Sequence, residues 1–380
     1  MPDQQPNRPA EDAPLGALKA AFESTGSPHW IMYTIQRLGL DRKLGFTLQI
    51  DYLDDRMSGA RHATEQALVD ETVDFIDTDW ITLARCRHQG LRVSAVYPYG
   101  RILGGLVVPS DSGIDNLPQL RGKTLGVVST LDKNWILARA YAQKRYQFDL
   151  ASEVSLQQAR SKSVLKQWLD QRRVDAALVY WHQIPFLAQQ QDYRLLLDIP
   201  SVLPELGLTP TPTTFFVFRD QFIAQRPALV RAFIKAFERA LRQLHNDDAL
   251  WLEIAQKLLH IDDPQLLAAM REIWRSRMPG SWNRAAIEEL QGLYQQLEQQ
   301  QQQQGETLGA GDQLPDGCFN WQFMTPSGDT RATPPTTTTT TTTTQTAIPQ
   351  TPAPPATPPP NPTPSTTITT EPAVAIPAGE

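Results

Sequence analysis

Polar and aromatic side chains gather in five short segments of this 380-residue sequence. Each segment follows a run typical of a β-strand and opens a helix or a turn, where free backbone N–H groups suit an anionic or strongly accepting ligand group. The aromatic faces suit a planar or apolar ligand body. Because open α/β sheets place their ligand crevice at strand ends, the segments predict one binding cleft. They are residues 24–30, 77–80, 97–101, 129–135 and 179–183.

Within these segments, Arg101 could meet a carboxylate or sulfonate bidentately, and Asp77 or Asp79 could meet an amine. The alternative is that Arg101 pairs with one of these aspartates or with solvent. The large aromatic content favours a small organic solute, such as a pyrimidine, an aromatic acid or an organosulfonate, over nitrate. Ordinary helix capping is the alternative role for any single segment. The candidate ligand-binding residues are Ser24, Thr25, His29, Trp30, Asp77, Asp79, Trp80, Tyr97, Tyr99, Arg101, Thr130, Asn134, Trp135 and Trp181.

Sequence motifs for catalysis are missing. The triplet 122–124, Gly-Lys-Thr, imitates the end of a phosphate-binding loop, but Leu117 stands where the first glycine is required and the segment precedes a strand. The six histidines show no spacing that places two on one metal, and Cys86 and Cys318 form no metal or redox motif. We therefore expect a protein that is not an enzyme and holds no metal or cofactor.

Composition describes a soluble globular chain. A net charge of -6 with 20% charged residues gives no basic surface for nucleic acid. No apolar stretch reaches the 18 or so residues needed to cross a bilayer. The composition changes sharply from Arg331 onward, where residues 331–380 contain 13 of the 31 prolines and 18 threonines. Such a segment cannot bury enough apolar surface to offset its ordering entropy, so we expect a disordered low-complexity tail.

The elements that position the cleft follow from hydrophobic patterning. Residues 15–201 alternate short apolar runs with amphipathic helical stretches, which is typical of a mostly parallel sheet. After residue 220 helices take over, beginning at Pro227 with one apolar face at 3.6-residue spacing. The folded part is predicted to end near residue 300, in a glutamine run. The predicted strands are 15–22, 46–53, 73–76, 92–97, 104–109, 123–128, 175–180, 195–199 and 215–218.

Several of these stretches also resemble a known family. Residues 105–109 (Gly-Leu-Val-Val-Pro) and 121–127 (Arg-Gly-Lys-Thr-Leu-Gly-Val) resemble the crossover into the second lobe of type II periplasmic solute-binding proteins of ABC transporters. Residues 73–76, 173–177 and 226–233 match further, in the same order and spacing. The nearest branch is the nitrate/sulfonate/taurine and thiamine-pyrimidine precursor group, and the resemblance spans residues 15–277.

The resemblance implies an α/β, two-lobe type II periplasmic-binding-protein fold (Venus flytrap) with mostly parallel sheets, C-terminal helices and a disordered Pro/Thr tail. Lobe one would comprise residues 15–105 plus 210–300, and lobe two residues 106–209. Residues 1–14 would be disordered and residues 301–380 a low-complexity, mostly disordered tail.

The function implied is that of a monomeric solute-binding component of an ABC-type importer, which closes two lobes on a small molecule and meets a permease and an ATPase. The family is periplasmic, whereas residues 1–14 show no signal peptide, so a cytoplasmic ligand sensor or scaffold is the alternative. A thiamine-pyrimidine synthase-like enzyme is a further alternative. Its cysteine-rich iron motif has no counterpart here, and Lys19 or Lys133 would have to serve as a pyridoxal lysine.

Overall fold

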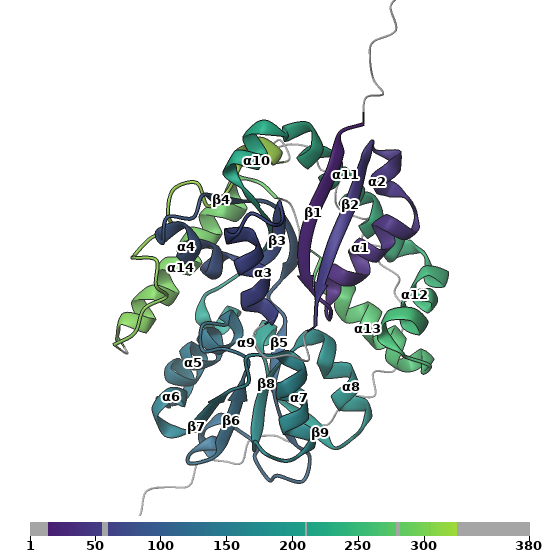
Figure 1. Ribbon diagram of the computed structural model, residues 1–380. Coiled ribbons are helices and arrows are strands. Elements are labelled where there is room, and N and C mark those ends of the chain that lie inside the picture. Colours follow the sequence, from purple (N-terminus) through teal and green to yellow (C-terminus); the bar gives the residue numbers. More distant parts are fainter. Residues whose placement is uncertain (1–13, 55–59, 210, 279–281, 304, 325–380) are drawn as a thin grey trace, which may run out of the picture. The chain divides into compact units, whose positions relative to one another are not determined.

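The computed structural model describes residues 14–54, 60–209, 211–278, 282–303 and 305–324. Residues 1–13 and 325–380, which include most of the predicted disordered ends, lie outside the described residues. In the described part the strands form two five-stranded sheets, seen in the upper and lower halves of Figure 1.

The first sheet has the strand order β2-β1-β3-β10-β4. β1, β2 and β3 pair in parallel, and β10 pairs antiparallel with both β3 and β4. One strand therefore runs against the other four. The strands are β1 (Gly16–Glu23), β2 (Phe46–Leu53), β3 (Phe75–Asp79), β4 (Val93–Arg101) and β10 (Pro212–Arg219).

The second sheet repeats this arrangement with the order β7-β6-β8-β5-β9. Here β5 is the antiparallel strand, paired with β8 and β9. The sequence patterns did not predict β7, because its Ser-Leu-Gln-Gln lacks an apolar run and it lies at the sheet edge with largely exposed side chains. The strands are β5 (Gly104–Pro109), β6 (Thr124–Val127), β7 (Ser155–Gln158), β8 (Ala176–Tyr180) and β9 (Tyr193–Asp198).

Helices between the strands cover both sheets, as expected for parallel strands joined by crossovers. Those of the first half are α1 (Ser27–Arg37), α2 (Leu40–Lys43), α3 (Ala60–Val69) and α4 (Trp80–His88). Those of the second half are η1 (Leu117–Leu120), α5 (Lys133–Tyr146), α6 (Leu150–Glu153), α7 (Lys162–Asp170), η2 (Trp181–Gln183), α8 (Ile184–Gln189), α9 (Ile199–Val202) and η3 (Pro204–Leu206).

The chain after β10 is helical, as predicted. The strongly amphipathic α11 packs Phe233 and Phe237 against Phe216 of β10, with ring centroids 5.1 and 5.0 Å apart. Together with α1 and α13 it buries one face of the first sheet. These elements are α10 (Asp220–Gln225), α11 (Pro227–Asn246), α12 (Asp248–Ile254), η4 (Ala255–Leu259), α13 (Pro264–Ser276) and α14 (Arg284–Gln303).

Two connections carry the chain between the sheets, β4 to β5 and β9 to β10. We retain the two lobes as a proposal, with one adjustment. Gly104 and Gly105 already pair with β8 and β9, so the first lobe boundary is better placed between Arg101 and Gly104 than after residue 105.

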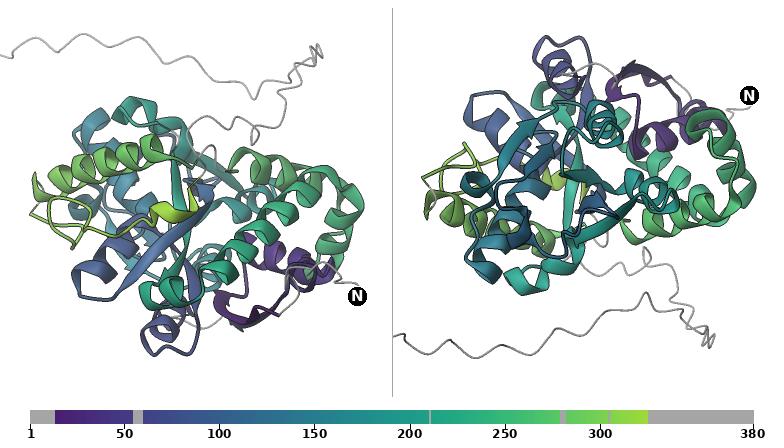
Figure 2. Two further views of the ribbon diagram at one scale, coloured as in Figure 1. Left: turned by 90° about the horizontal axis from the view of Figure 1, so that it is seen from above. Right: turned by 90° about the horizontal axis from the view of Figure 1, so that it is seen from below.

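Residues 305–324, called the C-terminal segment below, correct the prediction that the folded part ends near residue 300. The segment runs back beside α14 (Figure 2). There the Leu308 N–H donates to Glu298 at 2.6 Å. Phe319 is buried against Phe215 and Trp282, and it forms a β-bridge with Ala95. The apolar residues of the C-terminal segment are spaced irregularly among Gly, Asp and Pro, so no helical or strand periodicity indicated them. η5 (Trp321–Phe323) ends the segment.

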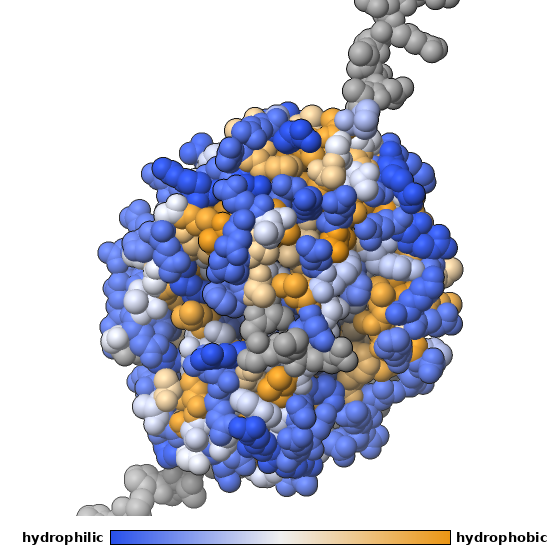
Figure 3. All heavy atoms as spheres, in the orientation of Figure 1, coloured by the Kyte–Doolittle hydropathy of each residue, from blue (hydrophilic) through white to orange (hydrophobic). Residues whose placement is uncertain are grey.

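Hydrophilic side chains cover most of the face shown in Figure 3, with apolar residues in small groups between them. No helix in the described residues is long and apolar enough to cross a membrane. In the same part of the chain, no three His, Cys, Asp or Glu side chains are grouped to hold a metal ion. The exposed large apolar residues described are Val69, Leu131, Tyr146, Leu195, Leu252 and Trp321.

Candidate functional site

A small pocket of about 60 Å³ lies where the carboxyl ends of strands from both sheets meet, and we call it the cleft pocket. The first sheet contributes the ends of β1, β3 and β4. The second half contributes the end of β8 and the first residues of α5 and α7. The lining residues are Glu23, Thr25, Gly26, Ser27, Pro28, Asp77, Thr78, Tyr99, Arg101, Leu103, Lys133, Lys162, Tyr180, Trp181, His182, Thr214 and Arg277.

Cations outnumber anions in this lining. Four of the lining side chains are Arg or Lys, whereas only Glu23 and Asp77 are acidic. Lys133, the first residue of α5, is 5% exposed, and no described residue accepts a hydrogen bond from its ammonium group. The Nε atom of Arg101 is also buried without a partner. A buried cation needs a counter-charge or a hydrogen-bond acceptor, so this lining is suited to an anion.

Lys162 connects the two halves across the pocket. Its Nζ lies 2.6 Å from Glu23 Oε2, and the two side chains are only 8% and 14% exposed. The same ammonium group lies 5.5 Å from the centre of the Tyr180 ring. Because Glu23 ends β1 and Lys162 begins α7, this buried ion pair holds the first sheet against the second half of the chain.

Arg277 follows α13 and forms the buried floor of the pocket. Its Nη1 donates to Ser27 Oγ at 2.6 Å, and its guanidinium lies 5.6 Å from the Tyr99 ring and 5.0 Å from the Trp181 ring. Burial lowers the pKa of this guanidinium, which remains charged at neutral pH. A Cβ atom on Gly100 would overlap Arg277, so only glycine leaves the guanidinium room there.

His182 lies beside these cations. Burial, together with the charges of Lys162 and Arg277, lowers its pKa to about 3. The ring is therefore neutral at physiological pH and can donate one hydrogen bond to a ligand without adding charge.

Five of the fourteen predicted ligand-binding residues line the cleft pocket, namely Thr25, Asp77, Tyr99, Arg101 and Trp181. Tyr99 and Arg101 reach it from within β4, which extends to Arg101 and not only to Tyr97 as the pattern indicated. The Tyr99 hydroxyl donates to Asp77 at 2.6 Å. Asp77 thus has a partner other than Arg101.

Ser24, which follows β1, and His29 and Trp30, in the first turn of α1, are not part of the pocket lining. The Ser24 carbonyl oxygen is 2.8 Å from His29 Nδ1, and the His29 ring packs 4.1 Å from Tyr52. Burial lowers the pKa of His29. Trp30 is buried, and the centres of the Trp30 and Trp181 rings lie 5.5 Å apart in an edge-to-face arrangement.

Three further predicted residues have structural roles away from the pocket lining. Asp79 caps α4, accepting from the N–H groups of Ile81 and Thr82 at 3.0 Å each. Trp80 is fully buried in the core. Tyr97 donates its hydroxyl to Glu238 at 2.9 Å.

The remaining three lie at the start of α5. Asn134 is buried, while Thr130 and Trp135 line a second cavity described below. Of the six rings expected to form an aromatic ligand surface, only Tyr99 and Trp181 line the cleft pocket. The aromatic surface offered to a ligand there is therefore smaller than the sequence suggested.

The sequence patterns did not identify the titratable residues Lys162, His182 and Arg277 as site members. Lys133 was considered only as a pyridoxal lysine, together with Lys19, and Lys19 does not line the pocket. Lys133 and His182 lie in two of the segments that follow predicted strands, 129–135 and 179–183, so their position after a strand could have identified them. Arg277 is distant in sequence, and no local pattern indicates its role.

A comparison with protein families matches residues 53–249 to the family described as NMT1/THI5 like. A comparison with curated protein sequences finds no match.

Solved structures give the same fold. The alkanesulfonate-binding protein SsuA from Xanthomonas axonopodis pv. citri, bound to MOPS, aligns with a TM-score of 0.59 and 15% identity over 74% of this chain and 92% of that one. The periplasmic aliphatic sulphonate-binding protein SsuA from Escherichia coli aligns with a TM-score of 0.59 and 13% identity, over 80% of this chain and 93% of that one. A putative periplasmic sulfonate-binding protein SsuA from Methylobacillus flagellatus aligns with a TM-score of 0.58 and 15% identity, over 83% of this chain and 93% of that one. The predicted periplasmic-binding-protein fold is confirmed.

Proposed function

Because this chain belongs to the NMT1/THI5-like family, we propose that it is a solute-binding protein that holds a small organic anion in the cleft pocket. The observation that carries the proposal is Lys133, a 95% buried lysine in the pocket lining whose ammonium group has no acceptor among the described residues. Arg101 and Arg277 add two buried Nε atoms without partners. A bound anion supplies the acceptors that these three cations lack.

Among an organosulfonate, a pyrimidine-like compound and an aromatic acid, the lining favours an organosulfonate with a short apolar body. The pocket has a volume of about 60 Å³ and the rings of Tyr99, Tyr180 and Trp181 in its wall, so it leaves little room for a ligand ring beyond the anionic group. Sulfonate oxygens match the hydrogen-bond geometry of Arg and Lys donors. The similar SsuA proteins are described as binding alkanesulfonates or aliphatic sulphonates, which supports this choice.

Binding by lobe closure follows from how the lining is divided. Arg101 and Arg277 come from the first half, and Lys133 and Lys162 from the second. A ligand that contacts both sets does so only when the lobes are together, and its free energy therefore favours the closed state.

The same proposal gives the protein a role in an ABC-type importer, as a monomer that delivers its solute to a permease and ATPase pair in the periplasm. Retention in the cytoplasm as a ligand sensor is the alternative. Fractionation of cells that express the full gene, with its upstream sequence, distinguishes the two.

One observation favours a second candidate, the synthase-like enzyme. Lys133 lies in the cleft pocket, where a lysine could form a Schiff base with pyridoxal phosphate. Incubation with pyridoxal phosphate tests this, because a protonated Schiff base moves the absorption of the free aldehyde to longer wavelength, and this shift disappears in Lys133→Met. A passive binder gives no such shift.

A melting-temperature panel of alkanesulfonates, pyrimidines, aromatic acids, taurine and nitrate tests the main proposal. We expect a short alkanesulfonate at about 100 times its Kd to raise the melting temperature by about 5 °C. Lys133→Met should remove the shift, whereas Lys123→Met, which replaces an exposed lysine, should keep it. Stabilisation by an uncharged pyrimidine alone, or by nitrate alone, would contradict the proposal.

A further inference from the structure

A second cavity, of about 190 Å³, lies between α5, the end of α14 and the start of the C-terminal segment, and we call it the back pocket. Arg85 of α4 and Leu156 of β7 complete its lining. It shares no lining residue with the cleft pocket. Two of the predicted ligand-binding residues, Thr130 and Trp135, belong to it.

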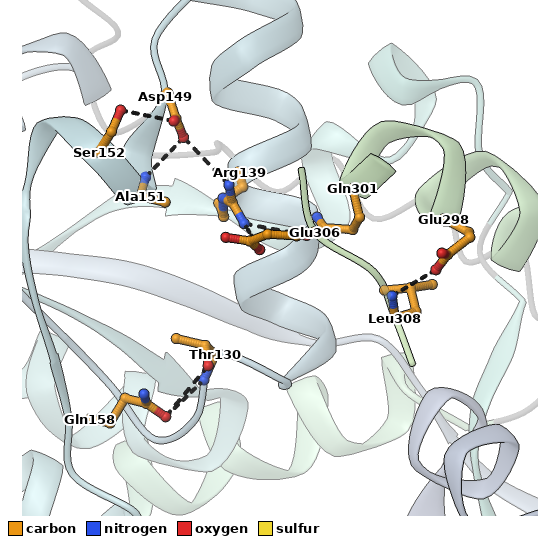
Figure 4. A network of polar contacts seen from close by, with 10 residues as sticks. All are labelled: Thr130, Arg139, Asp149, Ala151, Ser152, Gln158, Glu298, Gln301, Glu306 and Leu308. Carbon is orange, nitrogen blue, oxygen red and sulfur yellow. Dashed lines mark hydrogen bonds and ion pairs between the residues drawn. The ribbon is translucent and has the colours of Figure 1, made fainter. Parts of the chain in front are cut away.

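Arg139 is the central charged group of the back pocket. Its side chain is only 3% exposed, and its Nη1 donates to Glu306 at 2.5 Å and to Gln301 at 3.3 Å (Figure 4). Nη2 lies 3.6 Å from Asp149. Nε is buried and has no hydrogen-bond partner. The guanidinium therefore keeps one N–H group without an acceptor, and its nearest carboxylate comes from Glu306, whose side chain is 52% exposed.

A second guanidinium in the lining, that of Arg85, also has a buried N–H group without an acceptor. Arg85 Nη2 donates to Thr82 Oγ1 at 2.9 Å, but Arg85 Nη1 is buried without a partner. A buried donor left unsatisfied costs about 1–3 kcal/mol, and more when it is charged. Two such donors on the lining of one cavity indicate a site for a group with several acceptor atoms.

The rest of the lining is mainly apolar. Trp135 is 2% exposed, with its ring 5.8 Å from the Arg139 guanidinium carbon, and Ile136, Leu131 and Leu156 lie nearby in the same lining. This lining suits an anionic head group joined to a short apolar body.

We propose that the back pocket is a second ligand site, which binds a small amphipathic monoanion such as a short-chain carboxylate. The head group accepts hydrogen bonds from Arg85 and Arg139, and the chain packs against Trp135 and Leu156. Asp149 and Glu306 both lie against the Arg139 guanidinium, so an anion that binds Arg139 competes with Glu306. Because Glu306 is half exposed, its carboxylate can move into solvent without being buried unpaired.

Fluorine NMR of the full chain with 4,4,4-trifluorobutyrate tests the proposal. A bound resonance is expected, and Leu131→Glu should weaken binding at least tenfold, because it places a like charge at the rim of the pocket. Leu131 is 48% exposed, so this variant should fold. Leu252→Glu changes an equally exposed leucine outside the lining and should bind as the wild type does. Glu306→Gln removes the competing carboxylate and should tighten binding several-fold.

Binding here is independent of the cleft pocket, so Lys133→Met should leave the bound resonance in place. The proposal is overturned if trifluorobutyrate does not bind, or if Leu131→Glu and Glu306→Gln leave its affinity unchanged. Loss of the resonance in Lys133→Met, but not in Leu131→Glu, would assign the probe to the cleft pocket instead. None of these outcomes depends on whether an alkanesulfonate binds in the cleft.

Discussion

The Lys162 ammonium group and the Glu23 carboxylate form a buried ion pair, 2.6 Å long, between the start of α7 and the end of β1. Removing one partner of a buried pair leaves an uncompensated charge, which costs about 3–5 kcal/mol if that charge stays buried. Here the charge can regain water if the two lobes separate. If the proposed lobe closure is correct, we expect the pair to stabilise the closed arrangement in particular.

We expect Glu23→Gln to shift the ligand-free protein toward an open form. Small-angle scattering should show a larger radius of gyration. The free energy of unfolding in urea should fall by less than about 3–5 kcal/mol, because the unpaired Lys162 regains water. Asp170→Asn is the matched control, because it breaks a pair with Lys166 that is largely exposed and lies within one helix. An unchanged radius of gyration in Glu23→Gln would mean that the pair does not hold the lobes together.

Gly100→Ala should weaken anion binding by about tenfold, which corresponds to about 1.4 kcal/mol. The added methyl group overlaps the Arg277 guanidinium and forces it away from Tyr99 and Trp181. Titration calorimetry with an alkanesulfonate measures the effect. Gly292→Ala adds a methyl group on α14 where nothing lies within 4 Å, and it should bind normally. Equal affinity in the two variants would remove Arg277 from the site.

The low pKa of His182 predicts how stability depends on pH. Above about pH 6.5 the ring is neutral in both folded and unfolded chains, and its contribution to stability is complete. Between pH 6.5 and 3 the unfolded chain takes up a proton that the folded chain does not, so the free energy of unfolding falls.

His182→Gln should make urea unfolding less sensitive to pH over this range, whereas His88→Gln, which replaces an exposed histidine, should not. NMR should show the His182 ring still neutral at pH 5, and a bound anion should raise its pKa. A titration midpoint near 6.5 in the folded protein would refute the prediction.

Phe319 in the C-terminal segment should contribute strongly to stability. Its buried ring packs 5.5 Å from Phe215 and 5.6 Å from Trp282, so Phe319→Ala should cost about 3–5 kcal/mol of unfolding free energy. Trp321→Ala removes a larger ring that is 53% exposed, and it should cost less. Urea unfolding curves measure both. A loss below about 1 kcal/mol for Phe319→Ala would show that the segment is dispensable.

Local patterning accounts for most of the elements and for the position of the cleft. Apolar runs that alternate with amphipathic stretches predicted β1, β2, β5 and β8 within a residue or two, because side-chain periodicity and burial are local properties. The edge strand β7 and the C-terminal segment escaped prediction, because neither has a regular apolar period.

The sequence by itself determined that polar and aromatic residues follow the strands, and the cleft pocket lies at these strand ends. Only the tertiary structure decided which of those residues line it. Trp30 and Trp80 are buried in the core by packing, and Asp79 caps a helix, so none of the three lines the pocket. Arg277 reaches the pocket from 250 residues beyond Ser27, its hydrogen-bond partner. Such contacts depend on how distant elements pack, which no local pattern encodes.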